Sequence, residues 1–342
     1  MKKYWLGYVL PLLAAVPSAA QEQGSTPLAP PAQSVPSGQP APPGQPAPAG
    51  QAGQPAIEIT EAIDLTEDRT QRMTVPVSID GRGPYGFIVD TGAERTVISR
   101  ELAETLGLGP GHSATLFSMT EASHIQTVLI PELEVGRRTV SDIHAPALER
   151  RHLGAEGLLG VDSLRSQRVT LDFVRQEMTV TASNREQRRW PSDTITVTAR
   201  NRYGHLMLVD ASFDGERIYV IVDTGSEITV ANNALRQRLE RRHRLGAMRP
   251  VRMISVTGGI LDAEYGIARR ITIGGIDITN LPVAFAEVHP FRHLDLTDHP
   301  AILLGMDAMQ LFDRVSFDFA NRRVRLLPRH SARDRDVRLA AR

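Results

Sequence analysis

The chain contains no cysteine, and its only lysines are Lys2 and Lys3. The lack of thiols excludes cysteine catalysis, thiolate metal sites, disulfides and lipid anchors on cysteine. Basic and acidic residues balance at 39 each, so the composition lacks the basic excess that nucleic-acid binding requires. A length of 342 residues suits two compact domains with additional segments.

The N-terminus carries the pattern of an export signal. Two lysines precede an apolar run over residues 5–16, and the small residues Ser18-Ala19-Ala20 follow it. We predict a signal peptide over residues 1–20, cleaved after Ala20, and hence a periplasmic or secreted protein. The run is short for a membrane span, so we expect no span after cleavage; a retained membrane anchor is the alternative.

Composition divides the rest of the chain. Residues 21–56 are almost entirely Gln, Pro, Ala, Gly and Ser, which predicts a disordered linker. From residue 57 onward, short β-rich runs alternate with turn residues, which predicts an all-β fold with a short helix in each half. We expect an N-terminal lobe over residues 57–185, a C-terminal lobe over residues 186–328 and a polar tail over residues 329–342.

Two local features are predicted in detail. Residues 73–79 and 85–89 read as a hairpin joined by the turn Asp80-Gly81. Residues 101–108 read as a helix that ends near Gly109-Pro110.

An internal repeat organises the globular part. A motif of Asp, Thr, Gly, a small residue and Glu ends an apolar run twice, 133 residues apart, and an apolar-apolar-Gly element and a β-rich segment follow each copy in the same order. The paired segments are Asp90-Thr91-Gly92-Ala93-Glu94 with Asp223-Thr224-Gly225-Ser226-Glu227, Leu158-Leu159-Gly160 with Leu303-Leu304-Gly305, and residues 168–173 with residues 314–319. We infer a duplicated lobe.

The repeated motif predicts a pair of catalytic carboxylates. Asp90 and Asp223 each follow a buried strand, and a twofold arrangement of the lobes brings them together. Two adjacent buried carboxylates cannot both ionise, so they share one proton and act as acid and base at the same pH. Such a pair can activate a water for attack on a peptide carbonyl without a metal or another cofactor. Alternatively, Asp caps a duplicated structural turn.

The motifs resemble those of retropepsin-like aspartic peptidases. The resemblance covers about residues 70–185 and 203–328, and implies two pseudo-twofold-related β-barrel lobes with the active cleft between them. One chain supplies both halves, as in pepsin, so we expect a monomer with an internal pseudo-dimer. In this family the apolar-apolar-Gly element passes through a loop beneath the catalytic turn. Asp90 and Asp223 are the expected catalytic residues, and the expected supporting residues are Thr91, Gly92, Thr224 and Gly225.

Each half is expected to contain a flap, a hairpin that closes over the substrate. In the second half, residues 252–256 lead into a tip at 257–259. In the first half, residues 116–119 lead into a tip at 120–123, which lacks Gly. The expected substrate-binding residues are Ala93, Ser226, Thr120, Thr257, Gly258 and Gly259.

Other acidic residues repeat as well. We interpret Asp162 and Asp307 as N-caps of short helices, Asp172 and Asp318 as structural residues, and Glu94 and Glu227 as partners of nearby arginine or backbone. The second half has a longer loop before Gly305, which contains His289, His293 and His299. A metal site is an alternative reading of this loop, but Pro290 disfavours a regular helix, so we interpret the loop as a cleft edge that shapes substrate choice.

Together these features predict an exported aspartic endopeptidase that acts on proteins or peptides. One alternative is a peptide-binding module that uses the same cleft without turnover. Another is a latent peptidase, covered by residues 57–72 until they are removed.

Overall fold

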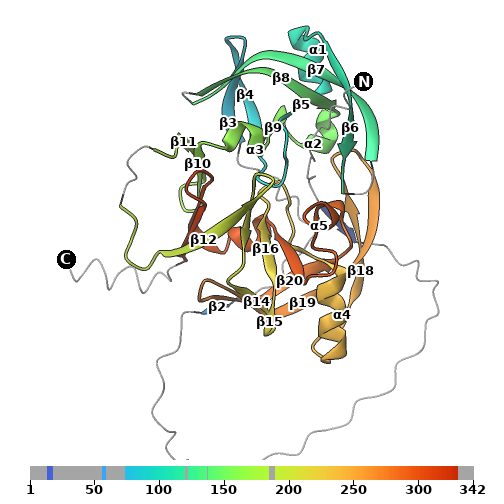
Figure 1. The fold of residues 1–342 in the computed structure, drawn as a ribbon, viewed down its shortest axis with the longest axis vertical. Coiled ribbons are helices and arrows are strands. Elements are labelled where there is room, and N and C mark those ends of the chain that lie inside the picture. The colour runs from blue at the N-terminus through green and yellow to red at the C-terminus, as the bar shows by residue number, and fades with distance from the viewer. Residues whose placement is uncertain are drawn as a thin grey trace, which may run out of the picture.

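The computed structural model describes residues 74–119, 122–136, 138–184 and 189–329, together with the backbone of two short strands, β1 (Ala14–Pro17) and β2 (Ala56–Glu58). Apart from β1 and β2, the predicted signal peptide, linker and latency segment lie outside the described residues, as does the tail beyond residue 329. The described chain is mainly β (Figure 1), which confirms that prediction.

The first half forms a seven-stranded sheet in the order β3-β4-β9-β5-β8-β7-β6, with β3 also paired to β7. Three short helices accompany it. Its elements are β3 (Thr74–Ile79), β4 (Arg82–Val89), β5 (Val97–Ser99), α1 (Arg100–Leu106), β6 (Pro110–Phe117), β7 (Ala122–Val135), β8 (Arg138–Leu148), α2 (Arg150–Leu153), β9 (Gly157–Leu159) and α3 (Val161–Leu164).

The second half lies below the first in Figure 1 and repeats its plan with additions. Its elements are β12 (Ile195–Arg202), β13 (His205–Leu208), β14 (Ala211–Phe213), β15 (Glu216–Arg217), β16 (Tyr219–Val222), β17 (Val230–Ala231), α4 (Asn233–Arg241), β18 (Arg249–Ile254), β19 (Ile260–Ile273), β20 (Ile276–Phe285), α5 (His289–His293), β21 (Ala301–Leu304), α6 (Met306–Met309), β22 (Phe312–Asp318) and β23 (Arg323–Pro328).

The hairpin expected at Asp80-Gly81 is present as β3–β4. Both turn residues have positive φ, 47° and 70°, the conformation that a tight hairpin turn between twisted strands requires. The second half repeats this turn at Asp214 and Gly215, where φ is 47° and 82°. The duplication therefore extends to individual backbone angles.

Helix α1 ends earlier than predicted. Gly107 adopts the left-handed conformation and its N–H bonds back to Ala103 and Glu104, so this glycine, rather than Gly109-Pro110, stops the helix. Ser99 caps its start, and Asn232, 133 residues later, caps α4. Helix α4 was not predicted individually, although the repeat and the Asn cap were available as signals.

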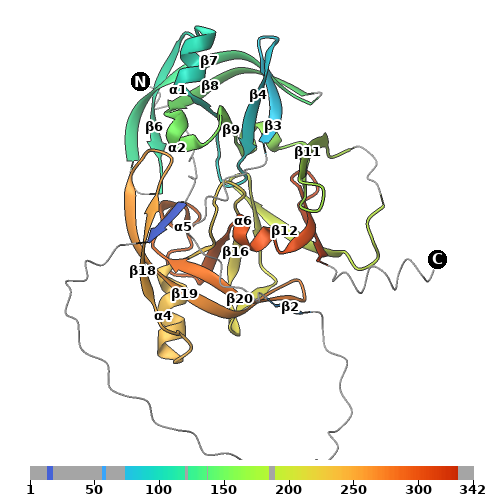
Figure 2. The same cartoon turned by 180° about the vertical axis from the view of Figure 1, so that it is seen from behind.

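One end of the 16-stranded sheet joins the two halves. This end runs β12-β23-β22-β10-β11, where β10 (Gln167–Asp172) and β11 (Glu177–Ala182) come from the first half. Strands β10 and β22 pair antiparallel, so that Arg168 faces Asp318 and Asp172 faces Arg314. Two reciprocal ion pairs result, at 3.1 Å and 2.6 Å. Figure 2 shows this end of the sheet at one side of the molecule, between the halves.

The structural role predicted for Asp172 and Asp318 agrees with these contacts. Between the two ion pairs, the hydroxyls of Thr170 and Ser316 lie 3.1 Å apart, near the centre of the reciprocal register. The repeated strands therefore pair with each other across a pseudo-twofold relation.

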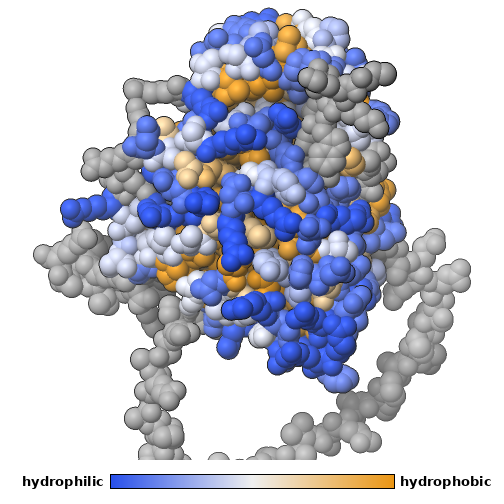
Figure 3. All heavy atoms as spheres, in the orientation of Figure 1, coloured by the Kyte–Doolittle hydropathy of each residue, from blue (hydrophilic) through white to orange (hydrophobic). Residues whose placement is uncertain are grey.

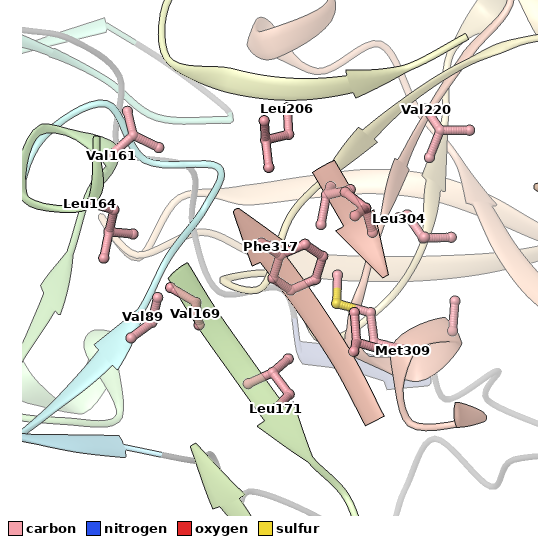
Figure 4. Packing of buried hydrophobic residues seen from close by; sticks show 14 of the residues in the cluster. Val89, Val161, Leu164, Val169, Leu171, Leu206, Val220, Leu304, Met309 and Phe317 are labelled. Carbon is pink, nitrogen blue, oxygen red and sulfur yellow. The ribbon is translucent and has the colours of Figure 1, made fainter. Parts of the chain in front are cut away.

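The two halves share one continuous hydrophobic core. Val169 and Leu171 of β10 lie close to Phe317 of β22 and to Leu304 and Met309 of the second half (Figure 4), and all five are buried. Burial of apolar area is the main favourable term in folding, so this shared core holds the halves in a fixed relation. A fixed relation is what two side chains from different halves need in order to meet.

Candidate active site

The two repeated turns meet at the boundary between the halves. Asp90 follows β4 and Asp223 follows β16, and each donates its backbone N–H to the end of a neighbouring parallel strand, at Leu159 and Leu304 (2.9 and 3.0 Å). Both aspartates are fully buried. Strands at the centre of a sheet thus fix the start of each turn.

Threonine hydroxyls join the two turns. Thr91 Oγ1 donates to the carbonyl of Val222 (2.8 Å), and Thr224 Oγ1 donates to the carbonyl of Val89 (2.5 Å). Each hydroxyl also accepts the backbone N–H of the other threonine at 3.1 Å. Thr91 and Thr224, which were expected as supporting residues, thus join the two turns by four reciprocal hydrogen bonds.

The inner oxygen of each carboxylate is held by its own turn. Asp90 Oδ1 accepts the N–H groups of Gly92 and Ala93, both at 2.9 Å. Asp223 Oδ1 accepts those of Gly225 and Ser226, at 3.0 and 3.2 Å. These bonds aim the outer oxygens away from the turns. Ala93 and Ser226, expected to contact substrate, hold the carboxylates through their backbone.

The carboxylate of Asp90 lies directly against the turn of the second half. A side chain on Gly225 would place its Cβ 2.3 Å from the Asp90 carboxyl carbon, so only glycine permits the approach. The charge of Asp223 raises the pKa of Asp90, so the two carboxyl groups are close enough to interact electrostatically. Among the described residues, no donor reaches Oδ2 of either aspartate. Because ionised carboxylates only accept hydrogen bonds, one shared proton satisfies both outer oxygens.

The surroundings of Asp90 and Asp223 shift the pKa values of their carboxyl groups for partly different reasons. Burial and then the charge of Asp223 hold the pKa of Asp90 well above its ordinary value. Burial also raises the pKa of Asp223, but the N–H of Gly225 and the positive charge of His205 oppose the rise. Burial thus raises the pKa of both carboxyl groups, and the N–H groups of each turn oppose the rise.

The comparisons with known proteins agree with this geometry. A family model described as "Aspartyl protease" matches residues 75–163 and 209–308, more than half of the chain, once over each repeated motif. This chain belongs to the aspartyl protease family. The double match, together with the fold, confirms the predicted retropepsin-like family with two β-barrel lobes.

One similar solved structure is that of a retropepsin-like aspartic protease from Rickettsia conorii. It is 22% identical to this chain, with a TM-score of 0.29, and the match covers 41% of this chain and 96% of the other. No curated protein matches this chain.

A second carboxylate in each half accepts hydrogen bonds from the loop that follows the Asp-Thr-Gly turn. Asp162 accepts the N–H and hydroxyl of Thr96 at 3.0 and 2.9 Å, and Asp307 accepts those of Thr229 at 2.9 and 2.7 Å. The N-cap prediction for Asp162 and Asp307 is wrong. The N-caps are the glycines at 160 and 305, two positions before these carboxylates, which instead bridge to the loop after each Asp-Thr-Gly turn.

The apolar-apolar-Gly elements pass directly beneath the two turns. A Cβ on Gly160 would lie 2.4 Å from the backbone of Arg95, and one on Gly305 would lie 2.5 Å from the backbone of Ile228. Both glycines therefore allow a crossing of two chain segments. The following residues donate to the carbonyls of Ala93 and Ser226, at 2.8 and 2.9 Å.

Glu94 links the halves through histidine. Its carboxylate lies 2.6 Å from His293 Nε2 of α5 and 3.9 Å from His205 Nε2 of β13. The other ring nitrogen of His205 donates to the carbonyl of Thr91 (3.2 Å), in the dyad turn itself. Burial alone would raise the pKa of Glu94, but hydrogen bonds and charge from both histidines lower it to about 2.

These contacts correct the expectation for Glu94, whose partners are two histidines of the other half rather than arginine. Sequence reasoning missed His205 altogether, because it lies outside the repeated motif and 114 residues from its hydrogen-bond partner Thr91.

Two hairpins extend toward the opposite halves. In the second half, strands β18 and β19 enclose a tip at residues 255–259, where the hydroxyls of Ser255 and Thr257 lie 2.6 Å apart. Gly258 sits directly against the His152 ring of α2. In the first half, Phe117 at the end of β6 packs on His289 of α5 (4.9 Å between ring centroids). Each flap thus meets a short helix of the other half; Thr120 lies outside the described residues.

The loop before Gly305 contains a helix despite Pro290. Helix α5 is five residues long and holds this proline in its first turn, where the missing N–H has no helical partner in any case. The expectation that Pro290 disfavours a helix here is therefore wrong, because a short helix begins beside it. Within the described residues no group of His, Asp and Glu side chains has metal-binding geometry. Nor does any described helix have the length and hydrophobicity to cross a bilayer.

Proposed function

We propose that this member of the aspartyl protease family is an endopeptidase that uses Asp90 and Asp223 to activate water. The meeting of two fully buried carboxylates, with outer oxygens free of donors among the described residues, carries the proposal. The two flaps provide a place for an extended peptide above the dyad, and the expected substrate contacts at Thr120, Thr257, Gly258 and Gly259 belong to this proposal.

In the proposed first step, a water between the carboxylates loses a proton to Asp223 and its oxygen attacks the peptide carbonyl carbon. Asp90 donates its proton to the carbonyl oxygen, which becomes a hydroxyl. In the second step, the proton on Asp223 passes to the leaving nitrogen, Asp90 recovers a proton from a hydroxyl, and the carbon–nitrogen bond breaks. The dyad ends as it began, with one proton.

The choice of Asp223 as base follows from its surroundings. His205 acts electrostatically to lower the pKa of Asp223, while the charge of Asp223 raises the pKa of Asp90. The threonine bonds and the N–H groups at each Oδ1 keep both carboxylates in position throughout, so no energy is needed to orient them during the reaction.

The test is cleavage of an unfolded protein or peptide library by the purified protein, with products identified by mass spectrometry. Asp90→Asn and Asp223→Asn are each expected to lower the rate by at least about a thousandfold, because each removes one partner in proton transfer. Asp80→Asn, at an exposed turn, serves as the matched control and should cleave normally. Full activity in both the Asp90→Asn and Asp223→Asn variants would contradict the mechanism. Binding of peptides without cleavage would favour the alternative of a peptide-binding module.

We also propose that the protein is exported and works as a monomer with lobes at residues 57–185 and 186–328. The support is the N-terminal pattern, the duplicated motif and the core shared by both halves. N-terminal sequencing of protein recovered from the periplasm or medium should find Gln21 first. Light scattering of the purified protein should give the mass of one chain.

A further inference from the structure

A pocket of about 1040 Å³ lies between the halves, beside the dyad turn of the first half. Its wall includes Glu94, four residues after Asp90, and His289 and His293 of α5. Since His289 also packs on Phe117 at the end of the first flap strand, the pocket lies at one end of the path that runs beneath this flap. Hydrophilic side chains cross the middle of the face seen in Figure 3, where the halves meet.

The pocket carries an excess of positive charge. Arg165, Arg292 and Arg322 line it, and all three are exposed. Within the described part of the chain, none of them makes an ion pair with a carboxylate. Glu94, the acidic residue of the wall, is already held by two histidines. Guanidinium groups without partners in a concave site favour an anionic ligand, and a carboxylate matches their planar donor geometry.

The equivalent end of the other half lacks this charge. Counting from the paired glycines at 160 and 305, Arg165 corresponds to Gln310. Counting from the paired aspartates at 172 and 318, Arg322 corresponds to Gln176, and both residues have the left-handed backbone, with φ of 50° and 56°. Duplication has therefore produced one end with arginine and one with glutamine.

Helix α2, at the glutamine-containing end, also carries arginines, but each of these forms an ion pair with a glutamate. Arg150 pairs with Glu156 at 2.9 Å and Arg151 pairs with Glu149 at 2.6 Å. The two ends of the cleft therefore differ in the number of arginines without an ion pair among the described residues. This difference makes the two ends distinguishable to a bound peptide, although the halves are related by pseudo-symmetry.

We propose that this arginine pocket, defined by Arg165, Arg292 and Arg322, binds acidic side chains of the peptide substrate. The inference rests on the proposed peptidase function and adds a substrate class to it. An extended peptide that crosses the dyad places a side chain two to four residues from the cleaved bond in the pocket, so Asp or Glu at that distance, on one side of the bond, is the preferred residue. Arg292 also acts electrostatically on Glu287, so Arg165 and Arg322 are the cleaner positions to change.

The test uses matched peptides that differ only by Asp or Glu against Asn or Gln, two to four residues from the cleaved bond on either side. We expect wild-type kcat/KM to favour the acidic peptide by about tenfold, mainly through KM, and the preference to shrink as salt screens the charges. The double variant Arg165→Gln/Arg322→Gln, which copies the other half, should lose the preference for the acidic peptide. Arg217→Gln, on the exposed face of β15, is the charge-matched control.

Binding of the same peptides to Asp223→Asn, measured by fluorescence anisotropy, separates this inference from the proposed function. An acidic preference in binding that the two glutamines remove supports the pocket even when nothing is cleaved. Equal treatment of acidic and neutral peptides by the wild type, in cleavage and in binding, overturns it. So does a preference that survives in the double variant.

Discussion

At the scale of single residues, Asp90 and Asp223 are held where they are costly to ionise. Their pKa values are raised by burial, so the folded state favours the protonated forms. For a carboxyl group with a raised pKa, the stabilising contribution is complete below its ordinary pKa near 4 and is lost as the pH rises through the raised value. At neutral pH the ionised dyad therefore destabilises the fold.

Replacing one aspartate should relieve this cost. We expect Asp90→Asn to raise the free energy of unfolding at pH 7 by on the order of 2 kcal/mol and to change it little at pH 3. Urea unfolding at both pH values measures the effect, with Asp80→Asn as the exposed control. If Asp90→Asn lowers the free energy of unfolding equally at both pH values, ionisation of the two aspartates does not destabilise the fold.

Substitution of Thr91 tests whether the hydrogen bonds between the two turns are needed for stability and activity. Its hydroxyl donates to Val222 and accepts from Thr224, so Thr91→Val leaves a buried carbonyl and a buried N–H without this partner. We expect a loss of about 2–4 kcal/mol in unfolding free energy together with a large fall in kcat. Thr91→Ser keeps the hydroxyl and should retain most of both. Equal behaviour of Val and Ser in the two assays contradicts the bracing role.

At the scale of elements, the β10–β22 pairing contains two ion pairs that are equivalent by symmetry and unequal in burial. The side chains of Arg168 and Asp318 are 8% and 3% exposed, whereas Arg314, paired with Asp172, is 25% exposed. Removing one partner of a buried pair leaves an uncompensated charge, and the cost grows with burial.

We therefore expect Arg168→Met to destabilise the protein by about 3 kcal/mol and Arg314→Met by clearly less. Adding Asp318→Asn to Arg168→Met should recover part of the loss, because the stranded charge is then gone. Chemical unfolding of the three variants provides the measurement. The reverse order of the two single variants would mean that burial does not set the energetics of this sheet.

At the scale of the whole molecule, Glu94 with His205 and His293 connects the dyad turn of one half to two elements of the other. The pKa of Glu94 is lowered to about 2, so its contribution is present above its ordinary pKa near 4.5 and is lost as the pH falls toward 2. The contact between the halves should weaken in acid for this reason.

Glu94→Gln tests that dependence. We expect the variant to be less stable than the wild type by on the order of 2 kcal/mol at pH 6, and the difference to shrink steadily below pH 4. Melting temperatures across this pH range measure it, and Glu132→Gln, on an exposed strand position, is the control. A difference that stays constant down to pH 2 assigns the loss to packing instead of charge.

The sequence by itself determined the features that depend on neighbouring residues or on repetition. The Asp80-Gly81 turn, the β-rich halves and the two Asp-Thr-Gly turns are written in short patterns, and duplication alone placed Asp90 and Asp223 in equivalent positions. Local patterns failed where a distant partner competed with a local role, as when Asp162 bridged to Thr96, 66 residues away, instead of capping its helix.

Tertiary structure decided what joins distant, unrepeated segments. The choice of His205 and His293 as partners of Glu94, and the unpaired arginines at one end of the cleft, depend on how α5 and the β12–β13 turn pack against the first half. No periodicity encodes these contacts, because hydrophobic burial fixes the relation of the halves and the polar groups then meet as neighbours. That packing also distinguishes Asp90 from Asp223, two residues that the repeat had made equivalent.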